Sequence, residues 1–170
     1  RGLSPAQQSR AILYGTTTPA GVPPGRHQGP DGMMLAASFK DNVVIPYEGI
    51  AAGEFDDRQR RALLDLTERY LSTLPEAPLR ARMNDVERHL AQTHFCWAGG
   101  IDDEAAFYYR IQSPVLWIEF DHQKGVLLNN ETPARFHTHT IVRTPNGNDY
   151  GADLLRLHYE TDRKSTRLNS

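Results

Sequence analysis

The sequence predicts an α+β domain, in which a helical hairpin and flanking helices pack on an antiparallel meander of about four strands. Two observations support this class. Apolar residues recur at helical spacing between residues 56 and 90, whereas from His94 onward they alternate with a period of two. Clusters of turn-forming residues separate the alternating segments, and such short links favour antiparallel neighbours.

The first element is a helix that begins after Ser4. Ser4 is a preferred N-cap residue, Pro5 suits the first turn, and Gln7 completes a capping box. We expect this helix to run to about Tyr14.

The next thirty residues are rich in helix-breaking types. Residues 16–32 contain four prolines and four glycines, which predicts a long loop that is either functional or mobile. Residues 33–39 are compatible with a helix or a strand. Residues 42–47 predict a strand, which Pro46 places at an edge or an end.

Two further helices follow. Asp56 and Gln59 form a capping box, and Pro75 and Pro78 are expected to end the first of these helices. The apolar stripes of the two helices are Leu63, Leu66, Tyr70 and Leu74, and then Leu79, Met83, Val86 and Leu90. The two stripes predict an antiparallel helical hairpin.

The second half of the chain predicts the sheet and one last helix. An Asn-Gly turn at 146–147 precedes Asn148 and Asp149, either of which can cap a helix that contains Leu154, Leu155 and Leu157. The expected strands are His94–Ala98, Phe107–Gln112, Val115–Asp121 and Arg135–Arg143.

Composition excludes several classes of protein. The 170 residues are 39% hydrophobic and 24% charged, and their mean hydropathy of −0.57 argues against a membrane span. A net charge of −2 argues against a dedicated nucleic-acid binder. The single cysteine excludes an internal disulfide framework and a Cys-rich zinc site. Oligomeric state is not predicted.

The two ends of the chain affect its interpretation. Residues 162–170, DRKSTRLNS, read as the translation of a sequencing adapter and are set aside. The chain also lacks an initiator methionine. We therefore expect residues 1–161 to form a single domain that is the C-terminal portion of a longer protein.

The polar sheet face is the candidate functional site. Alternation along the strands sends one set of side chains to the same side if the apolar faces share the other. That set comprises Tyr108, Arg110 and Gln112, then Trp117, Glu119 and Asp121, then Arg135, His137, His139, Ile141 and Arg143. Such a density of ionisable groups points to ligand binding or catalysis, and neighbouring strands hold facing side chains within bonding reach.

A divalent metal is the first hypothesis for this face. His137 and His139 stand at positions i and i+2 of a strand, so both imidazoles can converge on one ion. With Glu119 or Asp121 as third ligand or base, this set suits Fe(II), Mn or Zn.

Other interpretations remain open. Without metal, Glu119 and a histidine can form an acid–base pair, with Arg110, Arg135 or Arg143 holding an anionic small molecule. Alternatively, Trp117 and Tyr108 are exposed aromatic anchors of a non-catalytic interaction module. A third possibility is that the loop at residues 16–32 covers this face, which would then be purely structural. Asn148, Asp149, Tyr150 and His158 are candidates for the rim or second shell of the site.

The chain resembles one known family. The run FYYRIQSPVLWIEFDHQ, followed by HTHTIVRTPNGNDYG and LLRLHYE, is similar to bacterial and fungal proteins catalogued as domain of unknown function number thirty-five hundred. The resemblance covers about residues 4–160. It implies a further N-terminal segment, and because some members carry export signals it hints at an extracytoplasmic location. It assigns no activity and no site residue.

Overall fold

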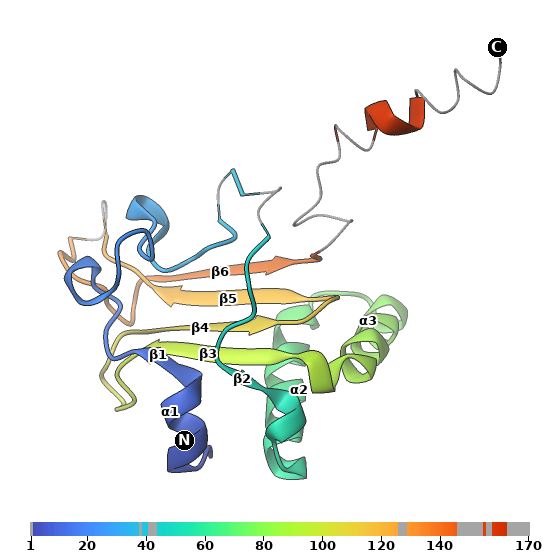
Figure 1. Ribbon diagram of the computed structural model, residues 1–170, viewed down its shortest axis with the longest axis horizontal. Coiled ribbons are helices and arrows are strands. Elements are labelled where there is room, and N and C mark those ends of the chain that lie inside the picture. The colour runs from blue at the N-terminus through green and yellow to red at the C-terminus, as the bar shows by residue number, and fades with distance from the viewer. Residues whose placement is uncertain are drawn as a thin grey trace.

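A computed structural model describes residues 2–37, 39–40, 44–125, 129–145, 155 and 158–162. The fold is α+β, with one mixed but mostly antiparallel sheet (Figure 1). Among the described residues, no helix has the length and apolar character needed to cross a bilayer.

The predicted antiparallel meander is confirmed. Neighbouring strands pair in the order β3-β4-β5-β6, and all three pairings are antiparallel. These strands are β3 (His94–Gly99), β4 (Phe107–Gln112), β5 (Trp117–His122) and β6 (Thr138–Arg143). Two of them begin later than predicted. Residues 135–137 form a turn before β6, and Leu116 precedes β5 in a turn that Ser113 closes with its hydroxyl.

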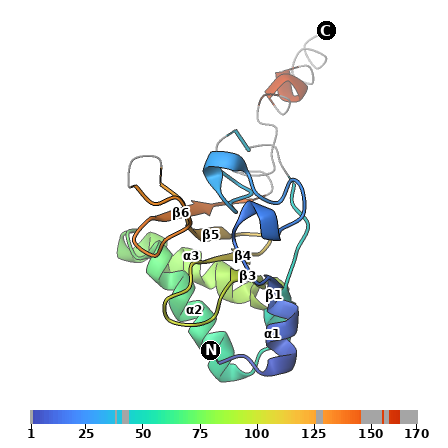
Figure 2. The ribbon, with the colours of Figure 1, turned by 90° about the vertical axis from the view of Figure 1, so that its left-hand side faces the viewer.

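Two short strands that the sequence analysis did not predict extend the sheet. The helix α1 (Pro5–Ala11) carries the expected capping box but ends three residues earlier than predicted. Ile12–Tyr14 instead form β1, which pairs in parallel with β3, and α1 lies beside this edge (Figure 2). The backbone groups of these residues are thus paired in the sheet and not in a further helical turn.

The predicted strand at 42–47 is not formed. Residues 42 and 43 lie outside the described part, and residues 44–47 have no regular structure. Pairing begins only at β2 (Ile50–Ala51), antiparallel to β3. Gly49 makes this approach possible, because its φ is +84° and a Cβ there would lie 2.1 Å from the Phe95 carbonyl oxygen.

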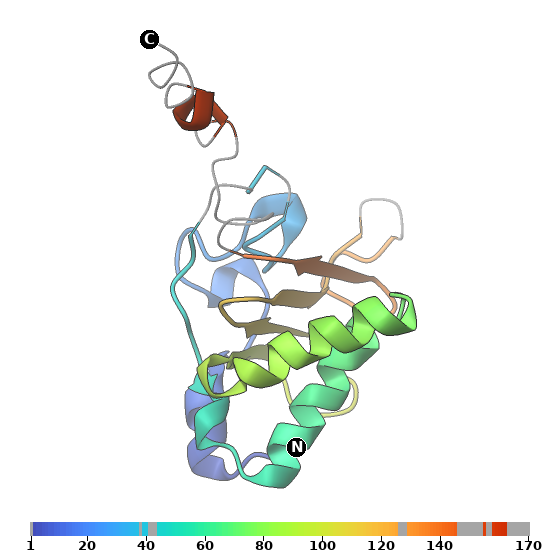
Figure 3. The same ribbon diagram turned by 90° about the vertical axis from the view of Figure 1, so that its right-hand side faces the viewer.

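Two longer helices cover one face of the sheet. The helix α2 (Asp57–Leu71) begins at the predicted Asp56 capping box, and α3 (Glu76–Arg88) follows after four residues. Pro78 does not break α3, because it lies in the first turn, where no helical N–H bond is lost. Both helices lie on the same side of the strands (Figure 3). The antiparallel hairpin arrangement of α2 and α3 remains a prediction.

The main core lies between these helices and the sheet. Apolar residues of the three central strands face α2 and α3, as alternation predicted. The buried members include Ile50, Leu63, Leu71, Val86, Tyr109, Ile111, Leu116 and Ile118. Short 3-10 helices lie in the connections, at Pro19–Gly21, Gly29–Asp31, Ala52–Glu54 and Leu90–Gln92.

The chain between β1 and β2 covers the other face of the sheet. We refer to residues 15–37 and 44–48 as the cover. Figures 1 and 3 show it on the side opposite α2 and α3. The cover places Met33 against Cys96 and Tyr108, and Ala36 against Trp117. Residues 33–39, compatible with helix or strand in the sequence, are neither where the structure describes them.

Candidate functional site

Two carboxylates of β5 hold the cover on the sheet. Glu119 is fully buried and accepts hydrogen bonds from the backbone N–H groups of Leu35 and Ala36, at 2.8 and 2.9 Å. It also accepts a 2.6 Å bond from the Tyr108 hydroxyl. Asp121 accepts a 2.8 Å bond from the backbone N–H of Met33. The carboxylates therefore supply acceptors for backbone that forms no secondary structure.

The Asp121 carboxyl is poorly solvated. Its side chain is 1% exposed, and its Oδ1 has no hydrogen-bond partner among the described residues. Burial raises the pKa of Asp121 to about 7, although the bonds from Met33 and Gln123 act in the opposite direction. A small cavity of about 40 Å³ adjoins it, lined also by Gly32 and His27.

The aromatic residues of this face are buried, so their predicted role is wrong. Tyr108 and Trp117 are both 0% exposed. Neither can anchor a partner protein in this fold, because the cover lies over both rings. Alternation correctly placed them on the polar side, but that side is an interior layer.

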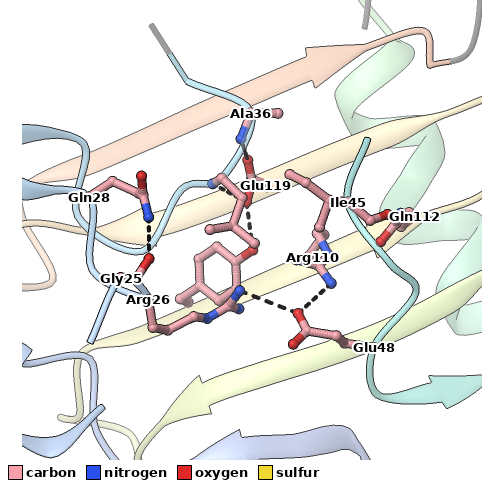
Figure 4. A network of polar contacts seen from close by, with 11 residues as sticks. Gly25, Arg26, Gln28, Ala36, Ile45, Glu48, Arg110, Gln112 and Glu119 are labelled. Atoms are coloured by element: carbon pink, nitrogen blue, oxygen red, sulfur yellow. Dashed lines mark hydrogen bonds and ion pairs between the residues drawn. The ribbon is translucent and has the colours of Figure 1, made fainter. Parts of the chain in front are cut away.

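Arg110 belongs to a buried ion-pair cluster. It is 1% exposed, its guanidinium lies over the Trp117 ring, and it donates a 2.7 Å bond to Glu48 of the cover. Arg26, also of the cover, donates to the same Glu48 oxygen at 3.3 Å (Figure 4). Arg110 therefore faces a carboxylate in the folded chain.

The two histidines of the H-x-H motif do meet. His137 lies in the turn before β6 and His139 lies in the strand, yet their Nε2 atoms are 2.9 Å apart. Burial lowers the pKa of His139, and His137 lowers it further, whereas Asp31 raises it. The neutral form of His139 is therefore favoured, and a neutral imidazole can accept a proton or bind a metal ion.

A cavity of about 390 Å³ opens beside His139. It lies between β6 and the part of the cover that Glu119 holds. Arg143 contributes to its wall and donates a 3.0 Å bond to the Ala36 carbonyl. The full lining is Asp31, Met34, Ala36, Ala37, Phe39, His139, Thr140, Ile141 and Arg143. Its volume is in the range of small-molecule sites, and its lining combines polar and apolar side chains in similar measure.

The predicted residues thus fall into two groups. His139 and Arg143 line the open cavity, with His137 in contact with His139, whereas Arg110, Glu119 and Asp121 lie beneath the cover. In the described part of the chain, no three His, Cys, Asp or Glu side chains are grouped closely enough to hold a metal ion.

The remaining candidates lie toward the C-terminus. Asn148, Asp149 and Tyr150 are outside the described residues. His158 is exposed, and its Nε2 lies 3.3 Å from Asp162 in a helical segment that stands away from the sheet (Figure 1).

Sequence reasoning missed Arg26, Asp31 and Glu48. All three lie in irregular parts of the cover, where no periodicity predicts which way a side chain points. The one sequence signal was the length of the loop at 16–32, which suggested a cover for the polar face and which contains Arg26 and Asp31.

Comparison with known proteins gives a family and no function. Residues 1–152 match the family model described as "Protein of unknown function (DUF3500)". No curated protein and no solved structure matches the chain. The chain, with its buried carboxylates and its cavity beside His139, belongs to the DUF3500 family.

Proposed function

We propose that this domain binds a small organic anion in the cavity between β6 and the cover. The observation that carries the proposal is the presence of Arg143, His139 and Asp31 around one open cavity of about 390 Å³. An arginine and a histidine beside apolar side chains are typical of sites that orient an acidic ligand.

The walls of the cavity suggest how such a ligand lies. The guanidinium of Arg143 suits a carboxylate or phosphate, whereas the Asp31 carboxylate repels a second negative charge. Met34, Phe39 and Ile141 offer apolar contact to the rest of the molecule. A monoanion with a short apolar chain fits this pattern best.

The histidine pair supports a catalytic version of the proposal. A neutral His139 can accept a proton from a bound ligand, and its 2.9 Å contact offers a path to His137. In this version Glu119 and Asp121 act by fixing the backbone of residues 33–36 that forms one wall of the cavity.

The test is a calorimetric titration of the purified chain with acetate, hexanoate and inorganic phosphate at pH 7. We expect hexanoate to bind more tightly than acetate, because of the apolar lining. Arg143→Gln should weaken hexanoate binding by about tenfold to a hundredfold, the loss expected for one charge-assisted hydrogen bond. Arg135→Gln is the matched control, because Arg135 is exposed and does not line the cavity.

His139→Gln provides a second variant in case Arg143→Gln unfolds through loss of its bond to Ala36. Hexanoate affinity that is unchanged in both folded variants, or absent from the folded wild type, would contradict the proposal.

A divalent metal ion at the histidine pair is the second candidate. Two nitrogens that bind one Zn²⁺ tetrahedrally at about 2.0–2.1 Å lie about 3.3 Å apart, close to the 2.9 Å between His137 and His139. Fe(II), Mn and Zn all suit a set of two histidines with one further oxygen ligand. An anionic ligand in the cavity could supply that oxygen.

Elemental analysis tests this candidate. We expect close to one equivalent of Zn, Fe or Mn in the wild type after reconstitution and less than a tenth of that in His137→Ala/His139→Ala. His89→Ala/His94→Ala is the matched control, because both of these rings bond to backbone carbonyl groups elsewhere. Equal metal contents in the three proteins would contradict it.

A further inference from the structure

Arg26 and Arg110 form a second site, separate from the cavity at β6. Both guanidinium groups donate to the same oxygen of Glu48, at 3.3 and 2.7 Å (Figure 4). Arg26 is 8% exposed and Arg110 is 1% exposed, whereas the Glu48 side chain is 33% exposed. Two nearly buried cations thus share one carboxylate that reaches solvent.

The hydrogen bonds of these arginines are incomplete. Nε and Nη2 of Arg26 and Nη1 of Arg110 are buried and have no partner among the described residues. An unsatisfied buried donor destabilises a fold, and folded proteins leave few of them. All three belong to groups that already meet at one oxygen, so a single oxyanion is well placed to serve several of them.

The other acidic side chains around these arginines are neutral or bonded elsewhere. Burial raises the pKa of Cys96 to about 11 and raises the pKa of Tyr108 well above its usual value, so both are neutral. The oxygens of Glu119 accept bonds from Leu35, Ala36 and Tyr108. Glu48 is therefore the carboxylate that bonds to the two guanidinium groups.

Glu48 is also the member of the cluster best placed to move. It lies in an irregular part of the cover, and a third of its side chain is exposed. Arg110, in contrast, belongs to the central strand β4 and is held against the Trp117 ring. The two arginines can stay in place while Glu48 turns toward solvent.

We propose that Arg26 and Arg110 form a binding site for an oxyanion, carboxylate or phosphate, and that Glu48 occupies this site as an internal substitute for the ligand. The ligand displaces the Glu48 side chain and accepts hydrogen bonds from the guanidinium N–H groups that lack partners in the free protein. This site lies beyond the proposed function, because Glu119 separates Arg110 of β4 from Ile141 of the cavity wall in the strand register.

Glu48→Gln tests this proposal, because the amide has the same shape but competes poorly for two guanidinium groups. Acetate and inorganic phosphate are titrated separately into wild type and variant at constant ionic strength, and binding is followed by calorimetry and by the shift in melting temperature. We expect at least one of the two anions to bind Glu48→Gln at least tenfold more tightly than wild type. The anion with the larger gain identifies the class of ligand.

Four further variants decide the interpretation. Glu54→Gln, which breaks the exposed Arg10–Glu54 pair, should bind anions as wild type does. Adding Arg26→Gln to Glu48→Gln should remove the gain, and Arg110→Met should do the same if that variant folds. Adding Arg143→Gln should leave the gain intact, which distinguishes this site from the cavity at β6. A folded Glu48→Gln protein with wild-type affinity for both anions would overturn the proposal.

Discussion

Asp121→Asn is expected to remove a pH dependence of stability of about 4 kcal/mol between pH 4 and pH 8. Burial raises the pKa of this carboxyl from 3.8 to about 7 in the folded state. Each pKa unit corresponds to about 1.4 kcal/mol, so the difference between the folded and unfolded states is of that size.

The sign follows from proton binding. The folded state holds the Asp121 proton more tightly than the unfolded state does, so the stabilising contribution is complete below about pH 4 and is lost as pH rises through 7. Asparagine keeps an oxygen for the Met33 N–H but does not ionise. The variant should therefore gain stability relative to wild type as pH rises.

The measurement is urea unfolding of both proteins at half-unit steps of pH. Asp65→Asn is the control, because Asp65 is exposed on α2 and its substitution should give a flat difference. A flat difference for Asp121→Asn as well would show that its carboxyl is not desolvated, and would contradict the burial of this face beneath the cover.

Glu119→Gln is expected to destabilise the fold by about 2–4 kcal/mol at pH 7. The carboxylate accepts two backbone N–H bonds and one hydroxyl bond, and hydrogen bonds to a buried charge contribute about 1.5–3 kcal/mol each. Glutamine turns one of its two oxygens into a donor, which then faces another donor.

The loss should be local as well as global. Amide hydrogen exchange at Leu35 and Ala36 should become faster by at least the factor that the unfolding free energy predicts. Glu54→Gln is the matched control, because its ion pair with Arg10 is exposed and such pairs contribute at most about 1 kcal/mol. If Glu119→Gln were no more destabilising than Glu54→Gln, the carboxylate would not hold the cover.

The sheet was predictable because its signals are local. Strict alternation in β4 and β5, together with turn residues between them, determined both the order of the strands and the side that faces α2 and α3. The capping boxes at Ser4 and Asp56 located two helix starts for the same reason.

The burial of the polar face was not predictable in the same way. Alternation indicates which side chains share a face, but it does not indicate whether water or protein covers that face. The cover is held by bonds from its backbone N–H groups to Glu119 and Asp121, and any residue type except proline can provide such a donor. Arg26 and Glu48 therefore left no pattern that a reader of the sequence could connect to Arg110.

The candidate site was predicted in part for a similar reason. Strand β6 is the edge of the described sheet, so His139 and Arg143 keep access to the cavity. Glu119 and Asp121 lie one strand further in, where they accept hydrogen bonds from the backbone of the cover. Residues of β6 can therefore reach a ligand, whereas residues of the neighbouring strand β5 position its binding site.

Binding of an organic anion in the cavity beside His139 is tested most directly by an NMR titration of the ¹⁵N-histidine-labelled chain with hexanoate at pH 7. We expect a saturable shift of the His139 ring nitrogens and a smaller one at His137. We expect no shift at His89 or His94, which lie outside the cavity. Saturable shifts at His89 or His94 with none at His139, or no shift at any histidine of the folded protein, would contradict the assignment of this cavity as the ligand site.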